Sequence, residues 1–284
     1  MWWIDIAYKR VLTIQDISCV GQCSMTVALP VLSACGLETC ILPTAILSTH
    51  TGGFGKPHVV HLSDAIAPTV RHWQDNGITF DAILVGYLGS IAAVEAVSEV
   101  LNTMLAPGGV SIVDPAMADN GKRYSGFDEA YVQAIKALCT QADIVIPNLT
   151  EAAMMGNCPY NGDNNGCYVS KSYVKQILSA LPFRRVILTG VGYAESTTGA
   201  SVWEDGVLAH CSHPKLSGSY HGTGDLFAAA FTGAYIQGKN LLEAAEIAGN
   251  FTYRCIKNTQ NAPAHWYGVK FETALPDLME MLKN

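Results

Sequence analysis

Two glycines, a threonine and a carboxylate stand together at the start of a predicted helix, as Gly222, Thr223, Gly224 and Asp225. Glycines at a helix start let backbone N–H groups crowd around an anion, and the first turn adds unpaired donors and the positive end of the helix dipole. The carboxylate can take a proton from an attacking hydroxyl while the amides stabilise charge on phosphoryl oxygens. The segment suggests phosphoryl transfer, although taken alone it fits a capped turn equally well.

Polar residues follow three of the predicted strands, at the place where open α/β sheets bind ligands. Asp114 and Asp119 follow the fourth strand, Asn148 and Glu151 follow the fifth, and Thr189 follows the sixth. Mg²⁺ prefers one or two carboxylates together with water, a demand that Asp114 and Glu151 could meet. With the glycine segment, these residues suggest a site for nucleotide phosphates and hydrated Mg²⁺.

The elements that must position these residues are short apolar runs that alternate with helical patterns. This alternation favours a doubly wound, mostly parallel sheet with helices on both faces. The predicted strands are Val11–Ile14, Thr39–Leu42, Ala82–Val85, Val110–Val113, Ile144–Ile146 and Val186–Leu188. The predicted helices are Met25–Cys35, Ser63–Asn76, Ile91–Leu105, one that begins at Asp225, Leu241–Lys257 and Phe271–Leu282.

Three local features complete this picture. Ser201–Trp203 and Val207–His210 flank an Asp-Gly turn, which predicts an antiparallel hairpin at one edge of the sheet. Thr150 has the side chain of an N-cap for the short helix that follows it. The stretch Gly156–Tyr168 is rich in asparagine and glycine, which predicts a solvated and mobile loop.

Composition limits the class of protein. A length of 284 residues suits one large α/β domain or two small ones, and no interdomain linker or repeat is evident. The net charge is -7 with 14% charged residues and no basic run, so neither a nucleic-acid surface nor an anionic-membrane surface is expected. Nine scattered cysteines without a CxxC pair, and an N-terminus unlike a signal peptide, predict a reduced, cytoplasmic protein.

Four motifs occur in the order and approximate spacing of the ribokinase-like superfamily: Gly-Tyr-Leu-Gly-Ser at 86–90, Asp-Pro-x-Met at 114–117, Pro-Asn-x-x-Glu at 147–151 and Gly-Thr-Gly-Asp at 222–225. With Ile14-Gln15 and with Ser-x-His-Thr at 48–51, the chain most resembles the pyridoxal kinases. The resemblance implies one ribokinase-like domain over residues 1–284, with a three-layer α/β/α fold and an antiparallel hairpin at one sheet edge. It also implies ATP-dependent phosphorylation of the 5'-hydroxymethyl group of a vitamin B6 vitamer, by a homodimer.

The resemblance further implies roles for single residues. Asp225 would be the base for the substrate hydroxyl, and the amides around Gly222, Thr223 and Gly224 would form the anion hole. Mg²⁺ would be organised through water by Asn148 and Glu151, with Asp114 beside it. The nucleotide would lie near Asp114, Asp119, Tyr124, Asn148, Thr189 and Gly222. The vitamer would lie near Asp16, Ser18, Thr44, His50, Tyr87 and Asp225. On general grounds Tyr87 could instead be a core aromatic and His50 a plain loop histidine.

One residue departs from the family. After Ile14-Gln15 the family usually has a serine that contacts the pyridine ring, whereas this chain has Asp16, with Ser18 two residues later. An ionised carboxylate only accepts hydrogen bonds, so it would favour a protonated ring or an amine-bearing vitamer. Alternatively, Asp16 belongs to a rearranged loop and never meets the substrate.

Two other functions fit the same motifs. A related branch phosphorylates hydroxymethylpyrimidine, which carries the same hydroxymethyl group on a ring of similar size. No cysteine is expected near the Gly-Thr-Gly-Asp turn, which argues against the covalent, dual-specificity variant of that branch. The chain could also be a B6-binding protein without turnover, although Asp225 and Glu151 argue for an enzyme. The vitamer preference and any K⁺ requirement stay open.

Overall fold

The structure, a computed structural model, describes residues 8–162, 168–218 and 220–283. Its elements follow one another as β1 (Arg10–Ser18), α1 (Met25–Ala34), β2 (Glu38–Leu47), β3 (Val59–His61), α2 (Ser63–Asp75), β4 (Phe80–Val85), α3 (Ile91–Thr103), β5 (Leu105–Val113), β6 (Ala118–Asp119), β7 (Lys122–Arg123), α4 (Glu129–Cys139), β8 (Ile144–Val145), α5 (Leu149–Met155), α6 (Lys171–Ala180), β9 (Arg185–Thr189), β10 (Thr197–Glu204), β11 (Val207–Pro214), α7 (Thr223–Ile236), α8 (Leu241–Thr259), η1 (Glu272–Ala274) and α9 (Leu275–Met281).

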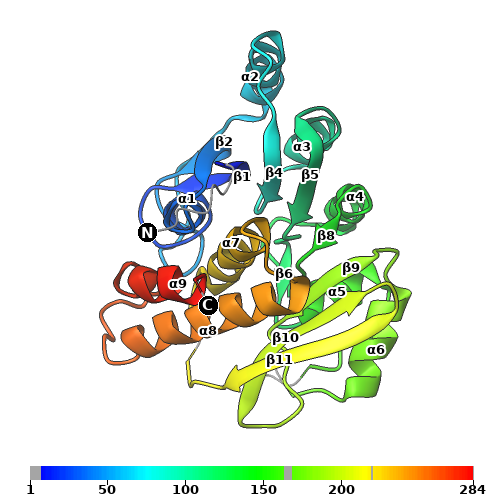
Figure 1. Ribbon diagram of the computed structural model, residues 1–284, viewed down its shortest axis with the longest axis vertical. Coiled ribbons are helices and arrows are strands. Elements are labelled where there is room, and N and C mark those ends of the chain that lie inside the picture. Colours follow the sequence, from blue (N-terminus) through cyan, green and yellow to red (C-terminus); the bar gives the residue numbers. More distant parts are fainter. Residues whose placement is uncertain (1–7, 163–167, 219, 284) are drawn as a thin grey trace.

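One sheet organises the fold (Figure 1). Its strand order is β11-β10-β9-β8-β5-β4-β1-β2-β3, and the strands from β9 to β2 run parallel. The hairpin β10–β11 joins antiparallel at one edge, and the short strand β3 joins antiparallel at the other. The ribokinase-like fold with an edge hairpin, expected from the sequence, is therefore confirmed.

Helices cover both faces of this sheet. The helices α2 to α6 pack against one face of the sheet and form one apolar cluster with it. The helices α1, α7, α8 and α9 form a second apolar cluster on the other face of the sheet. In β4 only Asp81 escapes burial, as expected of a central parallel strand covered on both sides. The helix α7 is buried continuously from Leu226 to Ala234, because it lies between the sheet and α8. This packing fixes the start of α7 beside the carboxyl ends of the strands.

Several elements differ from the sequence-based expectation. Three strands were not predicted, β3, β6 and β7, because they are only two or three residues long and offer no periodicity. The helices α4 and α6 were not predicted either. The predicted helix Ile91–Leu105 ends at Thr103, and Leu105 already begins β5. The N-cap of α5 is Asn148 and not Thr150, because Asn148 and Glu151 form a capping box.

Two further expectations concern regions at the margin of the fold. The predicted loop Gly156–Tyr168 includes residues 163–167, which lie outside the described residues, as do residues 1–7 of the N-terminal stretch. Throughout the described ranges, no helix has the length and apolar character needed to cross a membrane.

Candidate active site

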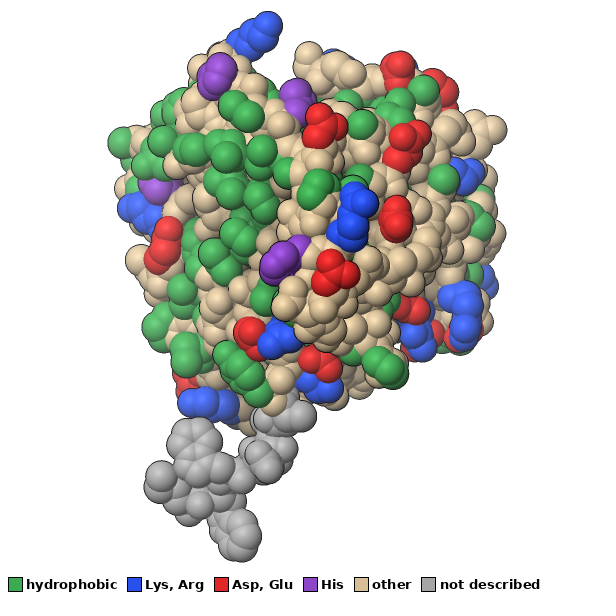
Figure 2. Space-filling view, turned by 90° about the horizontal axis from the view of Figure 1, so that it is seen from above, with side chains coloured by type: hydrophobic (Ala, Val, Ile, Leu, Met, Phe, Trp, Pro, Cys, Tyr) green, Lys and Arg blue, Asp and Glu red, His purple; other side chains and the backbone are tan. Residues whose placement is uncertain are grey.

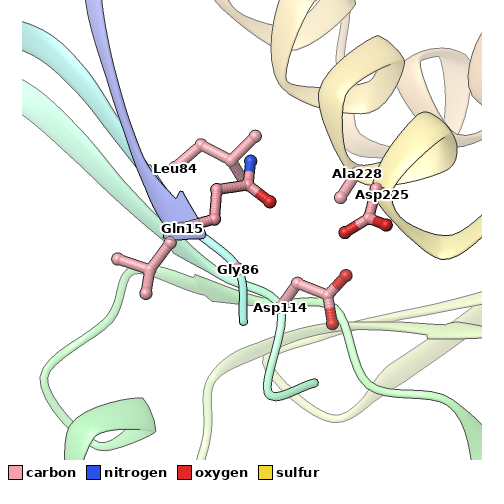
Figure 3. A pocket seen from close by; sticks show the side chains of 7 residues that line it. Gln15, Leu84, Gly86, Asp114, Asp225 and Ala228 are labelled. Atoms are coloured by element: carbon pink, nitrogen blue, oxygen red, sulfur yellow. The ribbon is translucent and has the colours of Figure 1, made fainter. Parts of the chain in front are cut away.

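The carboxyl ends of β1, β4 and β5 meet the start of α7 around a small, narrow pocket (Figure 3). Gln15 comes from β1, Gly86 follows β4, Asp114 follows β5, and Asp225 lies in the first turn of α7. The two carboxylates face each other across this space. The sheet thus brings together residues that are more than 200 positions apart in the sequence.

The start of α7 has the geometry of an anion hole. Its N-cap Gly222 has a left-handed backbone with φ 76°, and a Cβ there would lie 1.9 Å from the carbonyl oxygen of Gln22, so only glycine fits. The N–H groups of Gly224 and Asp225 donate to no acceptor within the described part of the chain. First-turn amides of this kind are free to bind phosphate oxygens.

Asp225 is the third residue of α7, and its carboxylate is only partly accessible to solvent. Burial raises the pKa of Asp225 from 3.8 to about 6, the negative charge of Asp16 adds to this effect, and a hydrogen bond from the backbone of Ser24 opposes it. A carboxylate with a pKa near neutral is a better proton acceptor than an exposed one, and it is still largely ionised at pH 7. The position and the pKa both suit a general base.

Asp114 completes an acidic cluster with Asp225 and Glu151. Its Oδ2 atom lies 4.0 Å from the position that a Cβ of Gly224 would take, so it stands directly beside the glycine turn. Burial, followed by the charges of Glu151 and Asp225, raises the pKa of Asp114 well above its usual range. Buried carboxylates that repel one another in this way bind a cation favourably.

Glu151 and Asn148 hold the segment that carries Asp114 and Asp119. One oxygen of Glu151 accepts the backbone N–H of Met117 at 3.0 Å and that of Ala118 at 3.4 Å, and the other accepts the N–H of Asn148 at 2.9 Å. Asn148 donates through Nδ2 to the carbonyl of Ala118 at 2.7 Å. Burial raises the pKa of Glu151. Both side chains therefore anchor the loop after β5 to the start of α5.

The hairpin β6–β7 extends this anchored segment towards solvent. The hydroxyl of Thr150 accepts the backbone N–H of Gly121 at the hairpin tip, at 3.0 Å. Asp119 is exposed, and Tyr124 is 40% exposed just after β7. Burial and the nearby carboxylates, Glu151 first, raise the pKa of Tyr124. Asp119 and Tyr124 therefore lie on one hairpin at the edge of the acidic cluster.

No three His, Cys, Asp or Glu side chains among the described residues are close enough to hold one metal ion directly. Thr189, at the end of β9, pairs with Asn148 and donates its hydroxyl hydrogen bond to the carbonyl of Pro147 at 3.4 Å. The residues expected to bind nucleotide and metal are therefore neighbours along the ends of β5, β8 and β9. Binding of Mg²⁺ by this cluster would need bridging water molecules.

The residues expected around the vitamer form a second group at the end of β1 and β2. Asp16 is only 2% exposed and accepts a hydrogen bond from the Ser18 hydroxyl at 3.0 Å. Burial raises the pKa of Asp16, although hydrogen bonds from Ser24 and Ser18 oppose the effect. The Thr44 hydroxyl donates to the carbonyl of Tyr87 at 3.5 Å, and burial together with the charge of Asp16 raises the pKa of Tyr87 to about 12. Asp16 therefore lies close both to Tyr87 and to Asp225.

His50 has a structural contact at each ring nitrogen. Its Nδ1 accepts the backbone N–H of Gly52 at 3.0 Å, so its Nε2 carries the proton and donates to the carbonyl of Tyr267 at 2.8 Å. Burial, together with the neighbouring His221, lowers the pKa of His50. The neutral ring thereby ties the segment after β2 to the segment before η1, and both nitrogens are already used.

Sequence reasoning overlooked three residues at this site. Gln15 is 2% exposed, and its Nε2 donates to Thr13 at 2.7 Å. Its Oε1 has no hydrogen-bond partner among the described residues and faces the pocket. Ser24 contacts both Asp16 and Asp225. Cys23 lies near Asp225, so the expectation that no cysteine approaches the glycine turn is wrong. Burial, Asp225 and Asp16 all raise the pKa of Cys23, which keeps the thiol protonated and a poor nucleophile.

The sequence profile of the phosphomethylpyrimidine kinase family matches residues 26–269. The chain belongs to this family. A crystal structure of pyridoxal kinase from Lactobacillus plantarum is 32% identical to this chain, with a TM-score of 0.87 and coverage of 96% of this chain and 97% of that one. The pyridoxal kinase PdxY of Histophilus somni is 27% identical over 89% of this chain and 90% of its own length.

Fold similarity extends further within the same group. The pyridoxal kinase from Leishmania donovani in complex with ADP and pyridoxamine is 21% identical, with a TM-score of 0.83, and covers 95% of each chain. The resemblance to pyridoxal kinases drawn from the sequence motifs is confirmed by these comparisons. Within the family, the glycine turn and Asp225 are the features on which a functional assignment depends.

Proposed function

We propose that this protein is an ATP-dependent kinase that phosphorylates the 5'-hydroxymethyl group of a vitamin B6 vitamer. The observation that carries the proposal is the position of Asp225, a carboxylate with a pKa of about 6, in the same helical turn as unpaired N–H groups. Relatives named as pyridoxal kinases, one of them solved with ADP and pyridoxamine, support the choice of substrates.

The reaction needs a base and a place for negative charge. The hydroxymethyl oxygen attacks the γ-phosphorus of ATP, its proton passes to the Asp225 carboxylate, and the bond from that phosphorus to the bridging oxygen breaks to release ADP. The N–H groups of Gly224 and Asp225, at the positive end of α7, hold the oxygens of the transferring phosphoryl group. Most of the rate enhancement comes from positioning and electrostatics.

The acidic cluster fits Mg²⁺ held through water. Asp114, Glu151 and Asp225 lie close enough to raise the pKa of Asp114, and no positively charged side chain pairs with them in the described residues. We assign the metal site to Asp114, with Asn148 and Glu151 fixing the loop around it. When bound, the metal neutralises charge on the nucleotide phosphates. Asp119, Tyr124 and Thr189 would contact the nucleotide from the rim.

Asp16 would set the preference among vitamers. It is buried beside Tyr87 and Asp225, and the hydroxyl groups of Ser18 and Ser24 turn towards it. A negative charge in such a place stabilises a cationic partner, so pyridoxamine gains relative to pyridoxal. Thr44 and Tyr87 would line the ring pocket, and His50 would hold the segment that closes it.

A homodimer fits the free edge of the sheet. All three residues of β3 are exposed, and Val60 and its partner Ile46 on β2 are 45% and 38% exposed. Figure 2, which looks onto the end of the molecule that carries β2 and α2, shows hydrophobic side chains gathered on one side. An uncharged edge of this kind pairs readily with a second copy of the chain. The eight described cysteines are all unpaired, which fits a reducing cytoplasm.

A turnover panel tests the proposed function. The protein is incubated with MgATP and pyridoxal, pyridoxamine, pyridoxine or hydroxymethylpyrimidine, and ADP release and phosphorylated product are measured together. We expect a phosphorylated B6 vitamer in stoichiometry with ADP. Product only from hydroxymethylpyrimidine would favour the alternative that the family name suggests, and binding of vitamers without turnover would favour a B6-binding protein.

A further inference from the structure

An imidazole stands directly before the anion hole and has no role in the mechanism above. His221 precedes Gly222, the N-cap of α7, and its side chain is exposed. Its ring nitrogens bond to no partner in residues 8–162, 168–218 and 220–283. The ring instead lies on Gly52, where a Cβ would come within 2.4 Å of its Cε1 atom. Within the described part of the chain, a packing contact and not a hydrogen bond therefore places this ring.

Gly52 belongs to a segment that several rings hold in place. His50 binds the Gly52 N–H and the carbonyl of Tyr267, and its ring centroid lies 5.0 Å from that of His221. The ring centroid of Phe54 lies 4.6 Å from that of Trp266, with the two planes tilted by 46°, and the Trp266 ring also fills the space beside Gly53. The segment 50–54 is thus fixed on one side to residues 266–267 and on the other to His221.

The His221 ring belongs to the residue directly before Gly222, so it is attached to the backbone that carries the N–H donors of the anion hole. Gly222 packs closely on the backbone of Gln22, since a Cβ on Gly222 would lie 1.9 Å from the Gln22 carbonyl oxygen. The Thr223 hydroxyl donates to the carbonyl of Tyr220 at 3.2 Å, which limits rotation on the other side of His221. A displacement of the His221 ring would therefore be passed to Gly222 and to the amides that follow.

We propose that His221 is a positioning residue, which couples the packing of segment 50–54 to the orientation of the anion-hole N–H groups. The ring acts through its shape: pressed on Gly52, it fixes the backbone of Gly222 when the segment over the vitamer is in place. This inference rests on the proposed kinase function. The proposal requires that another flat ring can replace the imidazole. It also requires that His221 no longer affects the rate once its contact with Gly52 is lost.

Four variants separate this role from others: His221→Ala, His221→Phe, Gly52→Ala and the double variant Gly52→Ala/His221→Ala. We expect His221→Ala to lower kcat for the vitamer by about tenfold or more with little change in the KM for ATP. The reason is that N–H donors in the wrong orientation stabilise the transition state less, while they affect ground-state binding of ATP little. His221→Phe should restore at least a third of the rate. Gly52→Ala should resemble His221→Ala, and the double variant should be no worse than either single variant.

Gly55→Ala is the control, since it lies in the same loop and no atom comes within 4 Å of its added Cβ, so it reports backbone strain alone at φ 80°. Additive losses in the double variant would overturn the proposal, and so would a rate that His221→Phe fails to restore. The second outcome would indicate a chemical role for the imidazole nitrogen. If wild type phosphorylates no vitamer at all, it is the proposed function that fails, and vitamer binding and Trp266 fluorescence in the same variants then test the coupling.

Discussion

Replacing the base should make the protein more stable at neutral pH while it destroys activity. In Asp225→Asn the variant side chain carries no charge, keeps its shape and can still accept the hydrogen bond from the backbone of Ser24. The wild-type carboxylate must be ionised at pH 8 in a place where burial and Asp16 oppose ionisation. The ionised carboxylate that catalysis needs therefore lowers the stability of the folded protein.

The size of the effect follows from the pKa. A rise from 3.8 to about 6 corresponds to about 3 kcal/mol, at ~1.4 kcal/mol per pKa unit. Because the folded-state pKa is raised, the contribution of Asp225 to folding is fully favourable below about pH 4 and is lost as pH rises through about 6. Relative to wild type, Asp225→Asn should therefore gain up to about 3 kcal/mol of unfolding free energy between pH 4 and pH 8.

Urea unfolding of both proteins at several pH values, with a chelator and without nucleotide, measures this difference. Asp205→Asn is a control of opposite sign, because Arg184 lowers the pKa of the exposed Asp205 carboxyl. A stability difference between wild type and Asp225→Asn that does not change with pH would refute the reasoning. In parallel, turnover of Asp225→Asn should fall by about 10² to 10⁴-fold, and wild-type kcat/KM should decline with falling pH near 6.

Three other substitutions give distinct expected results. Glu151→Gln should raise the Mg²⁺ concentration for half-maximal rate and cost about 1–3 kcal/mol of unfolding free energy, because its amide NH₂ meets backbone N–H donors; an unchanged Mg²⁺ titration would remove it from the site. Asp16→Ser should lower the ratio of kcat/KM for pyridoxamine over pyridoxal by about tenfold, and an equal ratio would show that the carboxylate does not sense the substrate. Gly86→Ala should displace Gln15, whose Oε1 lies 2.4 Å from the added Cβ, and cost about 1–3 kcal/mol in urea unfolding; wild-type stability would show that Gln15 moves freely.

The sequence was sufficient for the features that depend on local pattern. The parallel strands, the hairpin around Asp205-Gly206 and the glycine turn before α7 all carry residue types with strong local preferences. The ends of parallel strands share one edge, so the approach of Asp114 to Asp225 could also be anticipated. These features fix the fold and the centre of the site.

The contacts between distant loops could not be predicted in the same way. Ser24 and Cys23 lie beside Asp225 only because α1 packs on α7, and nothing in their local sequence indicates this. The N-cap assigned to Thr150 was wrong because Asn148 and Thr150 are both good cap residues and only the capping box with Glu151 decides between them. His50 is part of the loop scaffold through Tyr267, a partner 217 residues away.

The assignment as a B6 kinase depends on which acceptor the enzyme prefers in direct competition. Wild-type protein is given MgATP with equal concentrations of pyridoxal, pyridoxamine and hydroxymethylpyrimidine, and the initial rates of the three phosphorylated products are measured by mass spectrometry. We expect the two B6 products to exceed the pyrimidine product by about tenfold or more, which corresponds to ~1.4 kcal/mol in kcat/KM. A dominant pyrimidine product would contradict the assignment. So would B6 products that form equally fast with Asp225→Asn, and so would the absence of any phosphorylated product.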